Sequence, residues 1–206
     1  MGTKTIEHTL REKNRTVFNR WASSYDLSLF QYWMKKFHVP VIREVDFSTK
    51  PHILDISCGT GELLNSLVQV GEGDFYGVDL AEKMLEKART KLPLTVRLQK
   101  ADVHALPFEN NTFDYTLTTE AFHHYYNQQK ALQEMSRVTK KGGKIIIVDV
   151  NFFSPVIHFL FQKIEPGCVK INGKTEIRTF FEKAGLRIVK QQRIFAFAVM
   201  TVGVKS

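Results

Sequence analysis

The chain has 206 residues, of which 43% are hydrophobic and 24% charged, and its formal net charge is +8. These values are ordinary for a globular protein with one core, and no apolar run approaches the ~20 residues that span a bilayer. The two cysteines allow at most one disulfide and the polar N-terminus has no apolar signal region, so we expect a single domain over residues 1–206 in a reducing cytoplasm.

The first predicted element is a helical segment near residues 12–37, which ends before Pro40. It carries an aromatic set too dense for a free tail, namely Phe18, Trp21, Tyr25, Phe30 and Trp33. We expect residues 1–40 to fold as a lid over a bound ligand. A helix that packs permanently on the core is the alternative.

A strand, a tight turn and a helix follow. The apolar run at 52–57 contains Asp55 and enters a turn with Gly59 and Gly61, and a helix is predicted over 60–70. This arrangement lets the backbone approach an adenosine-type ligand at the carboxyl end of a parallel strand. The glycines can adopt positive φ and place no Cβ in the way of the ligand. The G-x-G-x-x-G spacing of NADH-binding turns is absent.

The next two predicted strands each lead to a carboxylate. The strand near 74–79 ends at Asp79, which is placed to accept two hydrogen bonds from a ribose diol. An N-cap for a helix over 81–91 is the alternative role. The strand near 95–100 leads to Asp102, which is placed to accept from an adenine amino group unless it only closes a turn.

Strands and helices continue to alternate, which implies a parallel sheet covered on both faces. Residues 152–173 have no clear assignment. The remaining strands are predicted near residues 113–118, 144–150, 186–192 and 194–203, and the remaining helices near residues 127–139 and 175–184.

Together these motifs resemble the class I S-adenosylmethionine-dependent methyltransferases, and within them the ubiquinone/menaquinone-biosynthesis type (methyltransferase domain 11-like). The resemblance covers residues 15–150 well and 151–206 loosely. The stretches that carry it include Trp21-Ala22, Tyr25-Asp26, Asp55 to Gly61, Gly77-Val78-Asp79, Ala101-Asp102-Val103, Leu106-Pro107-Phe108 and Lys141-Gly142-Gly143.

The resemblance implies a Rossmann-like, seven-stranded, mostly parallel sheet of order 3-2-1-4-5-7-6 with strand 7 antiparallel and helices on both faces. It implies S-adenosylmethionine as cofactor and S-adenosylhomocysteine as product. The cofactor-binding residues that it implies are Tyr25, Asp55, Ser57, Cys58, Gly59, Gly61, Asp79, Leu80, Met84, Asp102, Val103 and Thr119.

The resemblance also divides the chain into a cofactor-binding core at 50–150 and a substrate-side insertion with a C-terminal hairpin at 151–206. The apolar side chains after the fifth strand then suit a pocket for an aromatic or lipid-like acceptor, although buried packing would have the same composition. One position departs from the family, because Ser57 stands where glycine is usual. A positive φ at Ser57 would carry steric strain, which puts the cofactor affinity in doubt.

Two neighbouring histidines follow the fourth strand, where the acceptor is expected. Histidine titrates near neutrality, so His123 and His124 are candidate general bases, with a structural role as the alternative. Glu120 on the same loop contacts the cofactor or acceptor, or is solvent-exposed. We expect no metal site, because the side chains of adjacent histidines diverge and such pairs rarely chelate one ion.

The sequence favours a methyltransferase for a small acceptor over two alternatives. An RNA methyltransferase would explain the charge of +8, but the basic residues are scattered and no nucleic-acid module is present. The loop after the fourth strand lacks the Asn/Asp-Pro-Pro-aromatic signature of amino-group methylation. A non-catalytic module that binds S-adenosylmethionine is the third hypothesis. Peripheral contact with a membrane is compatible with the charge, and the oligomeric state stays open.

Overall fold

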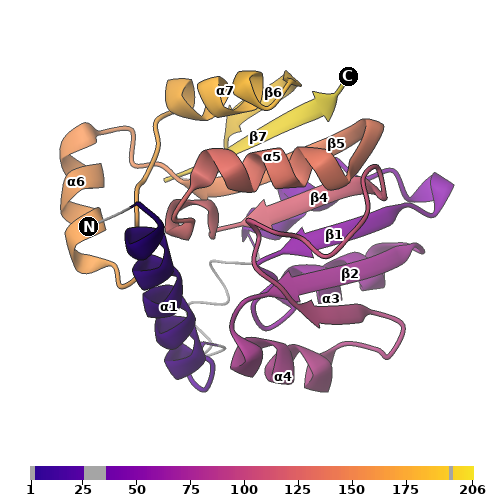
Figure 1. Cartoon of the computed structure of the whole chain (residues 1–206). Coiled ribbons are helices and arrows are strands. Elements are labelled where there is room, and N and C mark those ends of the chain that lie inside the picture. Colours follow the sequence, from indigo (N-terminus) through magenta and orange to yellow (C-terminus); the bar gives the residue numbers. More distant parts are fainter. Residues whose placement is uncertain (1–2, 26–35, 195–196) are drawn as a thin grey trace.

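A computed structural model describes residues 3–25, 36–194 and 197–206. In these ranges the strands form one seven-stranded sheet of order β3-β2-β1-β4-β5-β7-β6 (Figure 1). This is the predicted order. The strands are β1 (His52–Ile56), β2 (Asp74–Asp79), β3 (Arg97–Lys100), β4 (Phe113–Thr119), β5 (Thr139–Val150), β6 (Leu186–Arg193) and β7 (Ala198–Lys205).

The direction of the strands brings the predicted motifs to one edge. β1 pairs in parallel with β2 and β4, β2 pairs in parallel with β3, and only β7 runs antiparallel to its neighbours β5 and β6. The arrowheads of β1, β2 and β4 therefore point to the same side (Figure 1). The turn after β1 and the carboxylates that follow β2 and β3 meet at this carboxyl edge.

Helices cover both faces of the sheet, as predicted. Because side chains alternate along a strand, Ile53 and Ile146 pack into one apolar cluster while Leu54 and Ile147 pack into the other. The first cluster takes up α3 and the helical residues 36–42, and the second takes up α5 and α7. The helices on the sheet are α3 (Glu62–Val70), α4 (Glu82–Lys91), α5 (Gln128–Val138) and α7 (Lys174–Lys183).

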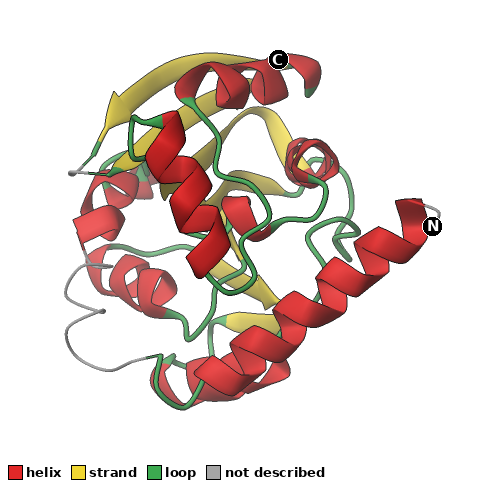
Figure 2. Ribbon diagram, turned by 90° about the vertical axis from the view of Figure 1, so that its left-hand side faces the viewer, coloured by secondary structure: helices red, strands yellow, loops and turns green. Residues whose placement is uncertain are grey.

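The N-terminal helix differs from its predicted bounds. α1 spans Thr3–Trp21, so it begins and ends earlier than the predicted 12–37. It closes in a turn in which Tyr25 N–H donates to the Trp21 carbonyl at 2.8 Å, and helical structure is described again at 36–42. Phe30 and Trp33 of the predicted aromatic set lie outside the described residues. α1 crosses the carboxyl edge of the sheet (Figures 1 and 2).

The segment without a predicted assignment contains a helix, α6 (Pro155–Ile164). Ser154 caps it and Pro155 occupies its first turn, where no amide N–H is needed. None of its residues is buried. It stands over the same edge as α1 (Figure 2). Among the described residues, no helix combines the length and apolarity needed to cross a membrane.

Candidate functional site

A cavity that is open to solvent lies at the carboxyl edge of the sheet. Its walls come from α1, from the turn after β1, from the ends of β2, β3 and β4, and from η2 (Phe122–His124). A concave site lined by apolar side chains and a few carboxylates has the composition of a small-molecule site. The predicted cofactor residues that line it are Tyr25, Ser57, Gly59, Asp79, Leu80, Met84, Asp102, Val103 and Thr119.

The backbone around Asp79 fixes its carboxylate at the tip of β2. Oδ2 accepts from the Gly59 N–H at 2.9 Å and Oδ1 accepts from the Ala81 N–H at 2.8 Å. Burial raises the pKa of Asp79 to about 6, although these N–H donors act in the opposite direction. The alternative role as N-cap is wrong, because Ala81 is the N-cap of α4 and Asp79 only accepts from its N–H. The carboxylate borders the cavity, and its contact with a ribose stays a prediction.

The two glycines of the turn after β1 face different sides, one the cavity and the other the core. Gly59 has a φ of +54° and faces Tyr25, whose Cε1 would lie 4.0 Å from an added Cβ. Gly61 faces the other way, because an added Cβ would lie 2.7 Å from Leu92 Cδ1. Gly61 also begins α3 at a φ of +82°. It shapes the turn and does not line the cavity.

Asp55 and Cys58 also lie behind the cavity wall and not in it, which departs from the predicted set. Both are buried, and the Cys58 sulfur packs against Gly77. Burial and the neighbouring charge of Asp79 raise the pKa of Asp55. These residues support the turn from the core side, so only two of the three predicted carboxylates, Asp79 and Asp102, face the cavity.

Ser57 adopts the strained conformation that its departure from glycine made possible. Its φ is +59°, a region that side chains with a Cβ rarely adopt. Its hydroxyl lies 3.0 Å from the Tyr125 hydroxyl, which in turn lies 2.8 Å from Thr118 Oγ1. The serine is therefore held by a buried hydroxyl chain. Glu120, also on the cavity wall, has a φ of +52°.

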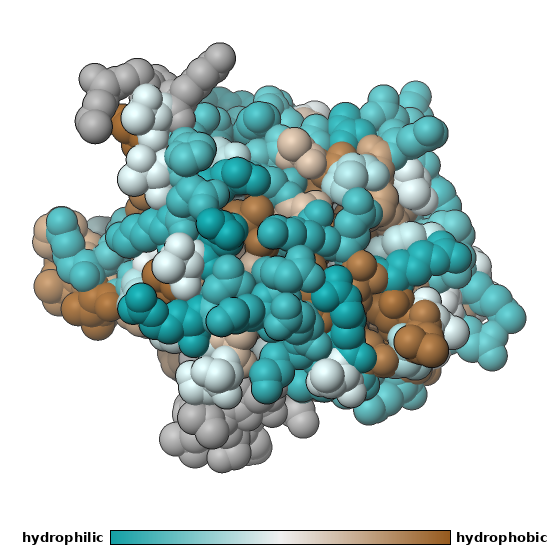
Figure 3. Space-filling model, turned by 60° about the horizontal axis from the view of Figure 1, so that its bottom comes forward, coloured by the Kyte–Doolittle hydropathy of each residue, from teal (hydrophilic) through white to brown (hydrophobic). Residues whose placement is uncertain are grey.

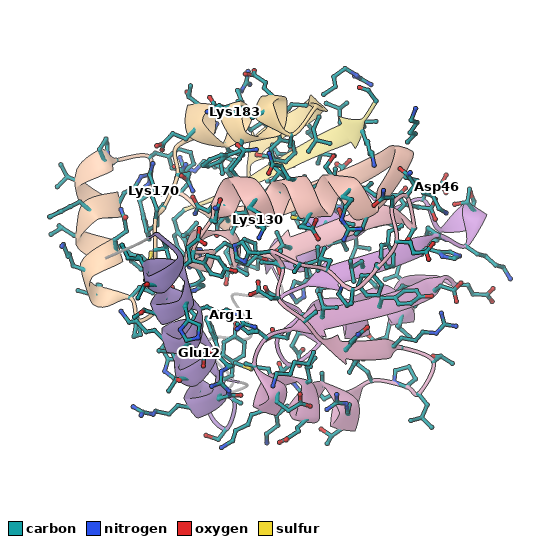
Figure 4. The ribbon with its side chains drawn as sticks, in the orientation of Figure 1. Arg11, Glu12, Asp46, Lys130, Lys170 and Lys183 are labelled. Carbon is teal, nitrogen blue, oxygen red and sulfur yellow. The ribbon has the colours of Figure 1, made fainter. Side chains whose placement is uncertain are left out.

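Partners that the sequence did not reveal surround the Asp102 carboxylate. Arg11 extends from α1 toward the sheet (Figure 4), and its Nε donates to Asp102 Oδ2 at 2.7 Å. Tyr126 donates to the same oxygen at 3.2 Å, and His104 binds Oδ1 through its backbone N–H and its ring. Burial opposes ionisation, but the bonds from His104 and Arg11 outweigh it and hold the pKa of Asp102 well below its usual range. An adenine amino group would share this carboxylate with α1.

The two predicted bases differ in position. His124 lines the cavity, whereas His123 lies behind it with Nδ1 2.5 Å from Asp149 Oδ1 and Nε2 3.3 Å from Glu165 Oε1. Burial lowers the pKa of His123, but the two carboxylates outweigh it and raise that pKa to about 10. Burial and the charge of His123 hold the pKa of His124 well below its usual range. Only His124 is thus neutral and in reach of a ligand.

The expectation that these histidines diverge is wrong. Their ring centroids are 4.0 Å apart, and His124 Nε2 lies 3.8 Å from the Glu165 oxygen that His123 approaches. Because η2 is a tight 3-10 turn, both rings point toward Glu165, the residue that follows α6. Glu120 stands nearby, half-buried, and burial raises its pKa to about 8. It is not the solvent-exposed carboxylate considered as an alternative.

The residues present fit S-adenosylmethionine. Gly59 leaves room for a close backbone approach, Asp79 offers acceptors for a ribose diol, and Met84 and Val103 supply apolar walls for a base. These are features of a nucleoside site at the carboxyl edge of a parallel sheet.

Comparisons with known proteins agree with this arrangement. The model of a family described as "Methyltransferase domain" matches residues 54–147. A demethylmenaquinone methyltransferase of Shouchella clausii is 30% identical over 207 aligned positions, which cover 84% of this chain and 87% of the relative.

Two solved structures share the fold. One belongs to the complex between the Haloferax volcanii Trm112 methyltransferase activator and a methyltransferase, with a TM-score of 0.81, 19% identity and coverage of 91% of this chain and 96% of that chain. The other is a SAM-dependent methyltransferase of Aquifex aeolicus, with a TM-score of 0.69, 21% identity and coverage of 82% and 89%. At these identities the likeness establishes the arrangement of elements and nothing finer.

Proposed function

Because the chain belongs to the class I S-adenosylmethionine-dependent methyltransferases of the menaquinone/ubiquinone type, we propose that it methylates a small aromatic or lipid-like acceptor, with a quinol ring as the first candidate. The support for a quinol is that the similar Shouchella and Bacillus cereus proteins are named demethylmenaquinone methyltransferases. The single observation that carries the proposal is the cavity at the carboxyl edge, whose lining includes Phe18, Glu120 and His124.

The residues of this chain position the reactants. When bound, S-adenosylmethionine supplies a methyl group on a positively charged sulfur that leaves as a neutral thioether. Asp79 and the Gly59 turn orient the nucleoside. Arg11 and Phe18 of α1 line the cavity and exclude water from it. Orientation of this kind can account for ~7–11 kcal/mol of barrier lowering.

We assign proton acceptance from the acceptor to His124 rather than His123. Phe18 packs edge-on against the His124 ring with centroids 5.0 Å apart, which restrains the ring at the cavity wall. His123 has both ring nitrogens engaged by carboxylates and does not reach the cavity. A general base of this kind contributes ~10²–10⁴-fold to a rate.

The test has a binding arm and a transfer arm. We expect S-adenosylhomocysteine to bind in calorimetry, and a labelled methyl group to appear on a naphthoquinol in preference to a catechol or RNA. His124→Gln should lower turnover by ~10²–10⁴-fold with little change in S-adenosylhomocysteine affinity. His52→Gln, at the opposite end of β1, is the control. Preferred transfer to RNA, or no binding of S-adenosylhomocysteine, would contradict the proposal.

We also propose that α6 rests on an anionic lipid surface from which such an acceptor is drawn. Apolar side chains are exposed along it, and Figure 3 shows hydrophobic atoms gathered at the left edge, the side on which α6 lies in Figure 1. Basic groups accompany them, with Lys163 over the Phe159 ring on α6 and, outside the helix, Arg193 over the Phe153 ring. Apolar side chains mixed with basic ones are the composition of an interfacial helix.

A further inference from the structure

Three side chains beside the cavity meet at one point, and none of them is a predicted nucleoside contact. They are His123 and His124 of η2 and Glu165 at the end of α6, and one ligand atom from each lies within 4.8 Å of the others. We propose that these three residues bind one divalent transition-metal cation, of which Zn²⁺ is the first candidate.

The separations of the three atoms suit a cation. Glu165 Oε1 lies 3.3 Å from His123 Nε2 and 3.8 Å from His124 Nε2. Ligands that stand ~2.1 Å from a tetrahedral zinc ion are ~3.4 Å apart. Two imidazoles and one carboxylate form a three-ligand set that leaves a coordination position open, as in catalytic zinc sites. Small shifts of the side chains are enough to enclose the ion.

The Asp149 carboxylate orients the His123 ring. His123 Nδ1 lies 2.5 Å from Asp149 Oδ1, so the ring presents Nε2 toward Glu165. A metal-binding histidine normally donates its other N–H to a carboxylate in this way, which fixes the tautomer and makes the ring a better ligand. Asp149 is buried on β5 and is the outer hydrogen-bond partner of His123 that such a site requires.

Backbone hydrogen bonds join η2, which carries the two histidines, to the segment that follows Glu165. The N–H groups of Val169 and Lys170 both donate to the His123 carbonyl, at 2.8 and 3.1 Å. Gln128 Nε2 links the same segments by donating to the Phe122 carbonyl at 3.0 Å and the Lys170 carbonyl at 2.8 Å. Glu165 is therefore brought to the histidines by fixed main-chain geometry and not only by its own side chain.

The charges favour a cation at this point. Asp149 Oδ2 and Glu165 Oε2 are buried and have no hydrogen-bond partner among the described residues. Such oxygens are costly to bury unless a positive charge compensates them. His123 lies between these carboxylates with a ring nitrogen on each, and a divalent ion that displaces the proton from its Nε2 gives a neutral cluster with them. Glu120, whose carboxyl also interacts electrostatically with His123, lies close by on the cavity wall.

His124 belongs to both the cluster and the cavity wall, so the open coordination position would adjoin the acceptor. A hydroxyl bound there would lose its proton more easily. This role, unlike the site itself, rests on the proposed function. In the metal-loaded protein it takes the place of proton acceptance by His124, whose Nε2 cannot bind the cation and a proton together. In the metal-free protein His124 accepts the proton as proposed above.

The test is metal binding by the tag-free full chain. Chelator-treated protein is titrated with Zn²⁺ against a chromophoric chelator, and we expect one tightly bound ion per chain. Glu165→Gln should weaken zinc binding by at least ~100-fold, and Asp149→Asn, which alters the outer partner, by ~10–100-fold. His52→Gln removes the histidine of another histidine–carboxylate pair, 3.1 Å from Asp74, and should change nothing. Equal zinc affinity in wild type and Glu165→Gln, or no tight ion, would overturn the proposal.

Two further measurements keep the test independent of folding and of methyl transfer. S-adenosylhomocysteine affinity is measured for each variant, so a loss of zinc with retained nucleoside binding reports the site alone. If Glu165→Gln fails to bind either ligand, X-ray absorption of zinc-loaded wild type decides, because two imidazole ligands are required and any other number rejects the site. Absence of methyl transfer to quinols would count against the proposed function and leave the zinc result standing.

Discussion

Asp79 is a half-buried carboxyl that must be ionised to accept two hydrogen bonds from a ribose diol. Its pKa of about 6 in the free protein means that binding below that pH requires loss of a proton. We expect the dissociation constant for S-adenosylhomocysteine to be flat above about pH 7 and to weaken by up to ~tenfold per pH unit below about pH 6. Calorimetry across this range measures the change.

Asp79→Asn serves as the control for this pH dependence. The variant cannot ionise, so its affinity should be nearly independent of pH over the same range. At neutral pH it should bind more weakly by ~1.5–3 kcal/mol for each charge-assisted bond lost. A wild-type affinity without pH dependence, or an unchanged affinity in Asp79→Asn, would show that the ribose lies elsewhere.

Ser57 allows backbone strain to be separated from hydrogen bonding. Ser57→Ala and Ser57→Gly both remove the bond to Tyr125, but only glycine adopts a φ of +59° without cost. We expect Ser57→Gly to be more stable than Ser57→Ala by ~1–2 kcal/mol in the free energy of unfolding, measured in urea. Equal stabilities would mean that the turn relaxes and that the serine carries no strain.

The residues of the site could be predicted only where a strand end determines their position. Asp79 and Asp102 follow parallel strands, so their arrival at one edge follows from strand direction. The direction in which a turn residue points depends on packing, and Cys58 and Gly61 therefore face the core instead of the cavity. Arg11 reaches Asp102 from 91 residues away, through the placement of α1, and has no local signal.

α1 makes contacts with the rim of the cavity that suit a closing lid and a permanently docked helix equally. Beyond Arg11, Asn14 donates to the His124 carbonyl at 2.6 Å and Asn19 accepts from the Lys83 N–H at 3.0 Å. If only the closed form binds, S-adenosylhomocysteine at ~100 times its dissociation constant should slow tryptic cleavage within α1 by up to ~100-fold. Cleavage at the exposed Lys141, on β5, is the internal reference. Equal rates with and without ligand would identify α1 as permanently docked.

The sequence analysis missed α6 and misplaced the bounds of α1. Helices and strands that bury one side leave a periodic apolar pattern, and β1, β2, α3 and α5 were found near their observed bounds for that reason. α6 buries no residue, but its apolar positions have helical spacing and Ser154 and Pro155 mark a helix start, so this helix could have been predicted. Glu165 lies at its end, 42 residues from His123, so the cluster could not be foreseen.

The whole molecule is basic, and α6 exposes apolar side chains over the edge of the sheet at which the cavity opens (Figure 1). The exposed side chains of α6 include Val156, Phe159, Leu160 and Ile164. With a net charge of +8, an anionic surface attracts the molecule and the apolar side chains then enter it. We expect the protein to co-sediment with anionic phospholipid vesicles more than with zwitterionic ones, and high salt should weaken the binding without abolishing it.

Substitution separates insertion of α6 from attraction by charge. Phe159→Ser with Leu160→Ser should weaken vesicle binding by ~1.5–3 kcal/mol for each side chain. Leu94→Ser is the matched control, because Leu94 is fully exposed on the loop between α4 and β3 and lies outside α6. Equal effects of the two changes, or binding to RNA in preference to vesicles, would contradict a lipid surface. If α6 does enter the lipid, Glu165 at its end lies where a membrane-borne acceptor would first meet the histidines, so vesicles should raise turnover of a lipophilic quinol and not of a water-soluble one.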